Sequence, residues 1–306
     1  MKGNLILFIG CLFVNLACAD DLINLDYIEY LKKTVSWEIE DYDNNIFKGW
    51  TQPELKKFFS DIYTSDADNN EEDEELELES LDSNITNLES FNFQQGMIDW
   101  SLHRCTHQIT SQGECGGCWA FSVAGVVSDR CCLKGIDYGW LSTQELISCD
   151  EKNCGCVEGS RAAGMEYVRK NGLVPASCFP YAGEGVGCPT KCNDGSNWAA
   201  SHVCRCRNIR KCTGERKLMQ CLKSGPVAGG MAVYVDFLYY RGGIYSWNRM
   251  AELVGYHSIR IVGYGPGYWK CANSWGSGWG MKGYFMIAKG ECDIEKRAPV
   301  ICDPIP

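Results

Sequence analysis

The apolar positions along the chain predict helices in its first half and strands in its second half. The pattern favours helices in these ranges: 26–37, 53–63, 118–132, 143–149 and 160–170. Apolar, β-favouring runs with turn signals between them predict strands in these ranges: 227–235, 258–263 and 284–288. Helices followed by strands predict an α+β protein with two subdomains.

A short apolar run opens the chain. Residues 5–16 are largely apolar, follow the positive charge of Lys2 and precede the small-x-small sequence Ala17-Cys18-Ala19. This arrangement is typical of a secretory signal peptide, which we predict at residues 1–19. The run is too short to cross a bilayer comfortably, and no later stretch contains about 20 apolar residues. We therefore expect a soluble mature protein with no membrane partner.

Charge divides the chain near residue 90. Residues 1–90 contain 6 Lys/Arg and 21 Asp/Glu, whereas residues 91–306 contain 23 Lys/Arg and 18 Asp/Glu. Nine of the acidic residues lie between Asp66 and Glu79, a solvated segment that favours proteolysis. Asn84-Ile85-Thr86 is an N-glycosylation sequon in a plausible exposed position. From Phe91 onward the chain is rich in Gly, Trp and Cys, which predicts a compact domain.

The composition narrows the class of protein further. With 22% charged and 45% hydrophobic residues, the chain is expected to fold rather than stay disordered. Its twenty cysteines predict disulfides and an oxidising compartment: extracellular, lysosomal or vacuolar. No nucleic-acid partner is predicted, because that would need a denser basic patch with a recognisable motif.

The segment from Gln112 to Phe121 carries the sharpest motif, which includes Cys115-x-x-Cys118. Taken alone, this pair could be a redox pair, half of a zinc site, or the setting of a catalytic cysteine. A thioredoxin-like pair is expected within a strand–helix–strand pattern, which is not evident here. A zinc site needs matching ligand pairs, and none of the four histidines has a paired spacing. We therefore predict neither a metal nor a cofactor.

The residues around this pair resemble the nucleophile motif of papain-family cysteine proteases, Cys-Gly-Ser/Ala-Cys-Trp, with Gly117 in the Ser/Ala place. His257 follows Cys118 by 139 residues, and Asn273 follows it by 155, each in a local sequence that matches the family. A lone histidine is ordinarily a core residue, but this setting favours a catalytic one. The resemblance implies a papain-like fold, in which an active-site cleft separates a helical subdomain from a β-barrel-like subdomain.

The resemblance also implies a role for each residue of the motif. Cys118 is the thiolate nucleophile, because a helix N-terminus and a neighbouring imidazole both favour the thiolate. His257 is the general base and acid, and Asn273 fixes the orientation of its ring. Trp275 covers the bond between them from water. The side chain of Gln112 and the backbone N–H of Cys118 bind the oxyanion.

Within the family, the resemblance covers most of residues 25–306 and is greatest to the cathepsin B-like branch. Trp37, Phe47-Lys48-Gly49 and Leu55 resemble the short inhibitory propeptide of that branch. The resemblance implies a monomeric cysteine-type endopeptidase (EC 3.4.22) that is made as a zymogen and acts on polypeptides. Residues 20–90 are then the propeptide, which inhibits the peptidase domain at residues 91–306, with the maturation cut between Asp82 and Phe91.

Three features bear on substrate choice. Glu295 aligns with a segment in which cathepsin B places a Glu at the base of the S2 pocket, which accepts Arg as well as apolar side chains. The family's Gly-Gly strand, which pairs with the substrate backbone, retains only Gly159, and Glu158 replaces the first glycine. The segment 182–187 is short and contains no histidine, so the occluding loop of cathepsin B is missing. This absence predicts endopeptidase rather than dipeptidyl-carboxypeptidase activity.

The resemblance implies four disulfides: Cys115–Cys156, Cys105–Cys132, Cys149–Cys188 and Cys178–Cys192. Nine further cysteines follow the signal peptide, in addition to Cys118: Cys131, Cys154, Cys204, Cys206, Cys212, Cys221, Cys271, Cys292 and Cys302. Their pairing cannot be read from the sequence, although those from Cys204 to Cys221 are expected to pair partly with each other. Because their number is odd, at least one is expected to keep its thiol.

Two other functions remain open at this stage. The chain could be a secreted, disulfide-rich binding protein that keeps the fold without activity, or a thiol–disulfide oxidoreductase that uses Cys115 and Cys118. The acidic segment also has two interpretations. It could dock on the mildly basic domain through charge and loosen on acidification, or it could be a solubilising linker, which the composition of residues 66–79 favours.

Overall fold

The computed structural model describes residues 22–59, 61 and 96–306. The predicted signal peptide, the acidic segment from Asp66 to Glu79, the Asn84 sequon and the expected maturation cut all lie outside the described residues. Within the described ranges, no helix is long and apolar enough to cross a membrane.

Six α-helices occur in the described part of the chain: α1 Leu25–Thr34, α2 Gln52–Phe58, α3 Cys118–Leu133, α4 Thr143–Cys149, α5 Arg161–Asn171 and α6 Glu215–Leu222. The first five correspond to the five predicted helices, although α1 and α2 end earlier than expected. In α1 the chain turns extended at Val35 and continues into a short strand. Helix α6 was not predicted. Its buried residues Leu218, Cys221 and Leu222 have the helical spacing that would have indicated it.

The strands of the described residues are β1 Glu38–Ile39, β2 Ile98–Asp99, β3 Arg205–Lys211, β4 Val227–Tyr234, β5 Tyr240–Gly242, β6 Ile244–Tyr245, β7 Leu253–Gly265, β8 Tyr268–Ala272, β9 Tyr284–Ala288 and β10 Val300–Ile305. One sheet has the order β3-β10-β4-β7-β8-β9-β6, with β2 paired to β7, and β1 pairs separately with β5. The three predicted strands are confirmed as β4, β7 and β9.

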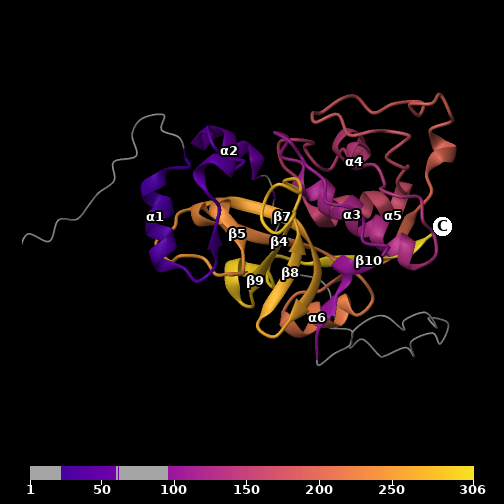
Figure 1. Ribbon diagram of the computed structural model, residues 1–306. Helices are drawn as coiled ribbons and strands as arrows, with labels where there is room; N and C mark the ends of the chain where they lie inside the picture. Colours follow the sequence, from indigo (N-terminus) through magenta and orange to yellow (C-terminus); the bar gives the residue numbers. More distant parts are fainter. Residues whose placement is uncertain (1–21, 60, 62–95) are drawn as a thin grey trace, which may run out of the picture.

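Helices and strands form two main apolar cores, which confirms the predicted α+β class. One core lies among α3, α4 and α5 with β3 and β10. The other lies among β4, β7, β8 and β9 and includes apolar residues of the N-terminal segment 22–59. Figure 1 shows helices α3, α4 and α5 on one side of the strands, with α1 and α2 on the other side of the molecule.

Helix α3 is buried on every side. Each residue from Cys118 to Cys132 is buried, as expected for a helix whose apolar residues surround its axis. The helix packs against β7, and the Ser122 hydroxyl donates a hydrogen bond to the Ile259 carbonyl at 2.6 Å. At its N-terminus, Gly117 lies so close to Ile147 that a Cβ atom would be 2.9 Å from that side chain. The lack of a side chain at Gly117 therefore lets the start of α3 approach α4.

The N-terminal segment 22–59 docks on the strand side through backbone and aromatic contacts. Strand β1 pairs with β5, and the Trp37 indole donates to the Ser246 carbonyl at 3.0 Å. The buried amide of Asn45 donates to the Leu238 carbonyl, also at 3.0 Å. The Phe47 ring packs edge-on against Trp275 at 5.0 Å between centroids. These contacts make residues 22–59 an integral layer of the fold.

Seven disulfides connect the described part of the chain, and the four implied by the resemblance are confirmed. The other three are Cys131–Cys204, Cys206–Cys302 and Cys212–Cys221. The expected mutual pairing from Cys204 to Cys221 is therefore right for Cys212–Cys221 alone. Cys206 faces β10, where Cys302 lies, because β3 and β10 are neighbours in the sheet. Cys154, Cys271 and Cys292 keep their thiols, as the odd count required.

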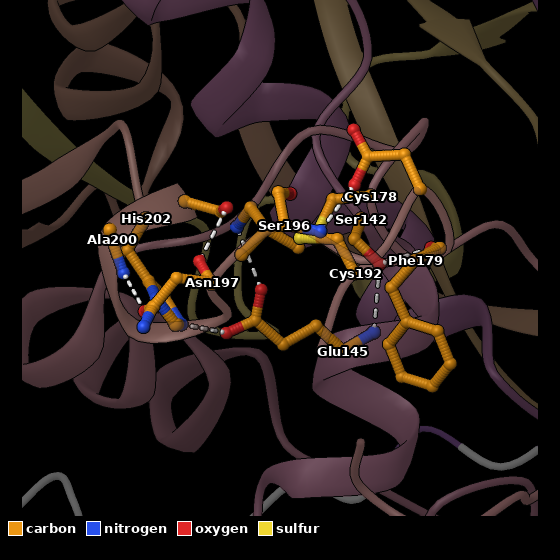
Figure 2. Close-up of a disulfide and its surroundings, with 12 residues drawn as sticks. Ser142, Glu145, Cys178, Phe179, Cys192, Ser196, Asn197, Ala200 and His202 are labelled. Carbon is orange, nitrogen blue, oxygen red and sulfur yellow. Dashed lines mark hydrogen bonds and ion pairs between the residues drawn. A yellow bond between two sulfur atoms is a disulfide. The ribbon is translucent and has the colours of Figure 1, made fainter. Parts of the chain in front are cut away.

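A buried carboxylate ties α4 to the long loop that follows α5. Glu145 accepts hydrogen bonds from His202 Nε2 at 2.9 Å, Tyr167 Oη at 3.0 Å and Val174 N at 2.8 Å. Figure 2 shows Glu145 between His202 and the Ser142 cap of α4, near the Cys178–Cys192 disulfide. The hydrogen bond to Glu145 raises the pKa of His202. Charge on the imidazole therefore strengthens this connection.

The guanidinium of Arg130 in α3 offers a test of how the two cores are joined. It is buried and donates to the carbonyls of Pro226, Cys221 and Gly225 at 2.7, 3.3 and 3.1 Å, just before β4. We predict that Arg130→Met lowers the free energy of unfolding by roughly 3 kcal/mol, because each buried carbonyl left without a donor costs about 1–3 kcal/mol.

Thermal unfolding of the full chain measures this effect, with Arg169→Met on the exposed face of α5 as the matched control. Arg169 forms a half-exposed ion pair with Glu166, so its loss is expected to change stability by about 0.5 kcal/mol or less. Equal changes in the two variants would contradict a joining role for Arg130.

Candidate active site

Cys118 is the first residue of α3, and Gly117 caps the helix. The backbone N–H groups at the start of a helix favour an anion there, which favours the thiolate form. The backbone N–H of Ser258 in β7 donates to Cys118 Sγ at 3.5 Å, so the sulfur lies where α3 meets β7. Cys118 is fully buried in the presence of the N-terminal segment, and it belongs to none of the seven disulfides.

His257 lies next to Ser258 in β7, and its ring is held from one side. Its Nε2 atom is 2.7 Å from Asn273 Oδ1, a residue directly after β8. Its Nδ1 atom is buried and has no hydrogen-bond partner within the described ranges. The Trp275 ring lies 4.9 Å from the imidazole. The Asn273 oxygen therefore favours a proton on Nε2, which leaves the lone pair of Nδ1 free to accept a proton.

The N-terminal segment covers the imidazole with two aromatic rings. Phe58 stacks near His257 at 6.4 Å between centroids, and Phe59 approaches it edge-on at 5.8 Å. His257 is consequently fully buried. Burial lowers the pKa of His257 to about 4, although the hydrogen bond to Asn273 and the charge of Asp61 act in the opposite direction. Covered in this way, the imidazole is neutral above about pH 4.

Gln112 lies beside the nucleophile loop and is fully buried. Its Nε2 atom donates to the Cys115 carbonyl at 3.0 Å and is 3.5 Å from the Phe58 carbonyl oxygen. Its Oε1 atom accepts from Ser274 Oγ at 2.6 Å, which fixes the direction in which the amide N–H groups point. The Phe58 carbonyl oxygen thus lies near the Gln112 amide, which the resemblance implies would bind the oxyanion.

Asp61 lies at the candidate site and contacts the chain on both sides of it. This residue forms a parallel β-bridge with Gly159, and its N–H donates to the Tyr256 carbonyl at 3.3 Å. A Cβ atom at Gly159 would overlap the Trp119 ring, which explains why this position is a glycine. The side chain of Glu158 is exposed beside it.

Glu295, the residue expected at the base of the S2 pocket, does not contact the Asp61 side chain. Glu295 Oε1 accepts hydrogen bonds from Trp269 Nε1 and Gly290 N, both at 2.8 Å. The side chains that contact the Asp61 carboxylate are instead Arg161, Ser258 and Arg297. None of these three residues was expected at the site from the sequence. The sequence did point to the neighbourhood of Arg297, because Arg297 lies two residues beyond Glu295 in the segment that resembles the S2 region of cathepsin B.

The geometry also bears on the redox and metal interpretations of Cys115-x-x-Cys118. Cys115 is bonded to Cys156, which braces the loop before α3, so it does not form a disulfide with Cys118. Among the described residues, no group of three or more His, Cys, Asp and Glu side chains is arranged to hold a metal ion.

Comparisons with known proteins agree with the resemblance noted in the sequence. The family model described as papain family cysteine protease matches residues 95–301. Cathepsin B-like CP3 of Giardia intestinalis is 34% identical over 68% of this chain and 72% of its own length. Cathepsin B of Dictyostelium discoideum is 29% identical over 67% of this chain and 71% of its own length.

Solved structures with the same fold include precursor forms. ProCathepsin B S9 from Trypanosoma congolense covers 94% of this chain and all of its own, with a TM-score of 0.76 and 23% identity. The Carica candamarcensis cysteine protease CMS1MS2, solved in complex with E-64, has a TM-score of 0.59 and 28% identity, and covers 68% of this chain and 97% of its own. The two-subdomain fold expected from the resemblance is thereby confirmed.

The burial of His257 predicts that the N-terminal segment docks less tightly as the pH falls. The pKa is about 4 in the covered state, against about 6.5 for a solvated imidazole, so the uncovered state binds more protons between these values. Docking is therefore fully favoured above about pH 6.5 and is progressively lost as the pH falls toward 4. The full effect is on the order of 3 kcal/mol, at about 1.4 kcal/mol per pKa unit.

Hydrogen exchange of the α2 amides, corrected for the intrinsic effect of pH, measures this docking. In a chain with Cys118→Ala, which removes the thiol of the candidate site, we expect protection to fall between pH 6.5 and 4. In the double variant that also carries His257→Gln, this pH dependence should largely disappear. An unchanged pH dependence in the double variant would mean that other groups control the docking.

Proposed function

The chain belongs to the papain family of cysteine proteases, a group of cysteine-type peptidases (EC 3.4.22), and from this premise we propose that it is a catalytically competent endopeptidase made as a zymogen. The observation that carries the proposal is the position of the imidazole. Asn273 holds one nitrogen of His257, while the other accepts no hydrogen bond from the described chain, and the next residue in β7 contacts the sulfur of Cys118.

In the proposed reaction, His257 takes the thiol proton and Cys118 Sγ attacks the carbonyl carbon of the peptide. The resulting oxyanion accepts hydrogen bonds from Gln112 Nε2 and the backbone N–H of Cys118. When the tetrahedral intermediate collapses, the C–N bond breaks and the imidazolium gives its proton to the leaving amine. Water, deprotonated by His257, then hydrolyses the thioester and restores the thiol.

Asn273 and Trp275 act on the orientation of the imidazole in this proposal. The Asn273 oxygen keeps a proton on Nε2, and the Trp275 ring, which is itself buried, shields that hydrogen bond from water. An imidazole held in this way needs little reorganisation when it becomes charged, which lowers the barrier to proton transfer.

The N-terminal segment is the proposed inhibitor. It covers His257 with Phe58 and Phe59, places the Phe58 carbonyl near Gln112, and pairs Asp61 with Gly159. A substrate needs each of these surfaces, so docked segment and substrate exclude each other. We propose residues 20–90 as the propeptide and residues 91–306 as the peptidase domain, with the cut between Asp82 and Phe91.

The proposed cellular route follows from the disulfides. Seven disulfides among the described residues indicate folding in an oxidising compartment of the secretory pathway. We propose that the signal peptide at residues 1–19 directs the chain there and that Asn84 is glycosylated. We propose a lysosomal, vacuolar or extracellular destination, of which the first two, being acidic, suit an enzyme whose inhibitor docks less tightly at low pH.

We propose endopeptidase action because of the short segment between Tyr181 and Cys188, which is anchored beside the nucleophile loop. The Tyr181 hydroxyl donates to the Gln112 carbonyl at 2.6 Å, and the Cys149–Cys188 disulfide closes the loop seven residues later. The six residues between Tyr181 and Cys188 contain no histidine to hold the C-terminal carboxylate of a substrate.

Labelling with an epoxide inhibitor of thiol proteases tests the nucleophile. We expect acid-processed protein to be modified at Cys118 and to lose peptide cleavage by at least about 10³-fold. His257→Ala should abolish both, and Cys154→Ser, which removes an exposed thiol elsewhere, should change neither. Absence of both labelling and cleavage in the unaltered protein would favour the binding protein of the same fold.

Digestion of unstructured peptides tests the cleavage mode. Internal cleavage products should appear first, and release of C-terminal dipeptides should be at least about tenfold slower, because no cationic group in the short loop binds the terminal carboxylate. Mass spectrometry of early time points distinguishes the two. Rapid successive loss of dipeptides from the C-terminus would contradict the proposed mode.

A further inference from the structure

The carboxylate of Asp61 lies in a pocket made by two arginines and a serine. Arg161 Nη1 donates to Asp61 Oδ1 at 2.5 Å, and Ser258 Oγ donates to the same oxygen at 2.9 Å. Arg297 Nη2 is 3.7 Å from Asp61 Oδ2. The three charged side chains are almost completely buried, with 0%, 4% and 9% of their surface exposed for Asp61, Arg161 and Arg297. Buried charges are tolerated only when paired, so this pocket suits an anion.

The pocket is held in place by contacts other than those to Asp61. Arg161 is the first residue of α5, and its Nη2 atom donates to the Arg297 carbonyl at 2.5 Å. A Cβ atom at Gly230 in β4 would overlap the Arg161 guanidinium, so the glycine provides the space that the arginine fills. The Arg297 guanidinium lies over the Tyr256 ring at 3.7 Å, a favourable cation–π arrangement. Both cations are therefore positioned by the peptidase domain itself.

The pocket adjoins the proposed nucleophile. Ser258 contributes its hydroxyl to the pocket and its backbone N–H to Cys118 Sγ. The backbone of Asp61 pairs with Gly159 and Tyr256. A substrate strand that pairs with Gly159 would direct a side chain into the same enclosure. The segment that contains Arg297 is the one aligned with the S2 pocket, which receives the second residue on the amino side of the cleaved bond.

We propose that this pocket selects an acidic side chain, so that the enzyme cleaves peptides with Asp or Glu at the second position before the cleaved bond. The inference rests on the proposed endopeptidase function and names its substrate class. Once Asp61 has left with the propeptide, both guanidinium groups face the substrate. A carboxylate restores the ion pairs that Asp61 makes, an apolar side chain does not replace them, and an arginine adds a third positive charge. Glu295 led us to expect a pocket that accepts Arg, whereas the two arginines favour an acidic side chain.

The sharpest test compares substrates on the unaltered protein. Full-length chain, processed by acid, is given internally quenched peptides that differ only at the second position before the cleaved bond: Asp, Glu, Asn, Leu or Arg. We expect kcat/KM for Asp to exceed that for its neutral isostere Asn by about tenfold or more, with Arg the poorest substrate. Equal values for Asp and Asn overturn the inference, because shape is then recognised and charge is not.

Two charge-reversal variants locate the preference. Arg297→Glu should lower the Asp/Arg ratio of kcat/KM by about a hundredfold or more, because attraction and repulsion exchange places. Lys296→Glu is the matched control, since its side chain is 76% exposed on the adjacent residue and pairs with Asp293. It should leave the ratio within about threefold. Equal effects of both variants would mean that the general surface charge causes the preference, and the proposal that this pocket selects acidic side chains would be wrong.

Labelling of Cys118 separates the possible failures. If Cys118 is labelled by the epoxide and the peptides are cleaved without preference for acid, the endopeptidase stands and the acidic pocket is wrong. If no peptide is cleaved and Cys118 is not labelled, the endopeptidase fails and the inference fails with it. Labelling of Arg297→Glu shows that its active site is intact, and the Asp/Asn comparison does not depend on that variant folding.

Discussion

The burial of α3 is the constraint on which the rest of the molecule depends. A helix without a polar face must be enclosed, so α4 and α5 cover one side and β7 covers another. Its N-terminus can approach α4 this closely only because Gly117 has no side chain. The first residue of this helix is Cys118, and the strand against it carries His257. The packing that holds the two subdomains together therefore also brings sulfur and imidazole to one place.

The same physical effect that hides the site also governs its chemistry. Aromatic side chains of the N-terminal segment remove the imidazole of His257 from water, which lowers its pKa to about 4 and, in the proposed zymogen, also excludes substrate. A neutral imidazole stabilises a neighbouring thiolate less than a charged one does. Covering the site thus blocks access and weakens the nucleophile at once. Uncovering it returns the imidazole to water, where its charged form is less costly.

Much of the fold could be predicted because its signals are local. Five helices and three strands follow from apolar patterning, and four disulfides follow from the resemblance of the cysteine sequence. The pairs Cys131–Cys204 and Cys206–Cys302 could not be predicted, because they depend on β3 lying beside β10 and α5, which no local pattern encodes. Strand β3 itself is largely charged and is recognised only by its neighbours in the sheet.

The pocket around the Asp61 carboxylate could not be predicted for the same reason. Asp61, Arg161 and Arg297 are far apart in the sequence and meet only in the folded chain. The resemblance around Cys292 singled out Glu295, whereas the side chain of this segment that contacts Asp61 is Arg297, two residues further on. Glu295 instead stabilises the turn at Gly290. A residue-by-residue resemblance identified the catalytic candidates, whose setting is local, better than the pocket, whose setting is tertiary.

If both proposals hold, the Asp61 carboxylate gives the inhibition and the substrate preference a shared origin. A mutation that reversed the charge of the arginine pocket would leave Asp61 buried beside like charge, and the precursor would lose its own restraint during synthesis. A change of charge at Arg297 would therefore require a compensating change at Asp61, 236 residues earlier in the chain, to keep the precursor inhibited. Selection on substrate choice and selection on self-inhibition would then act on the same positions, which would make this specificity slow to change.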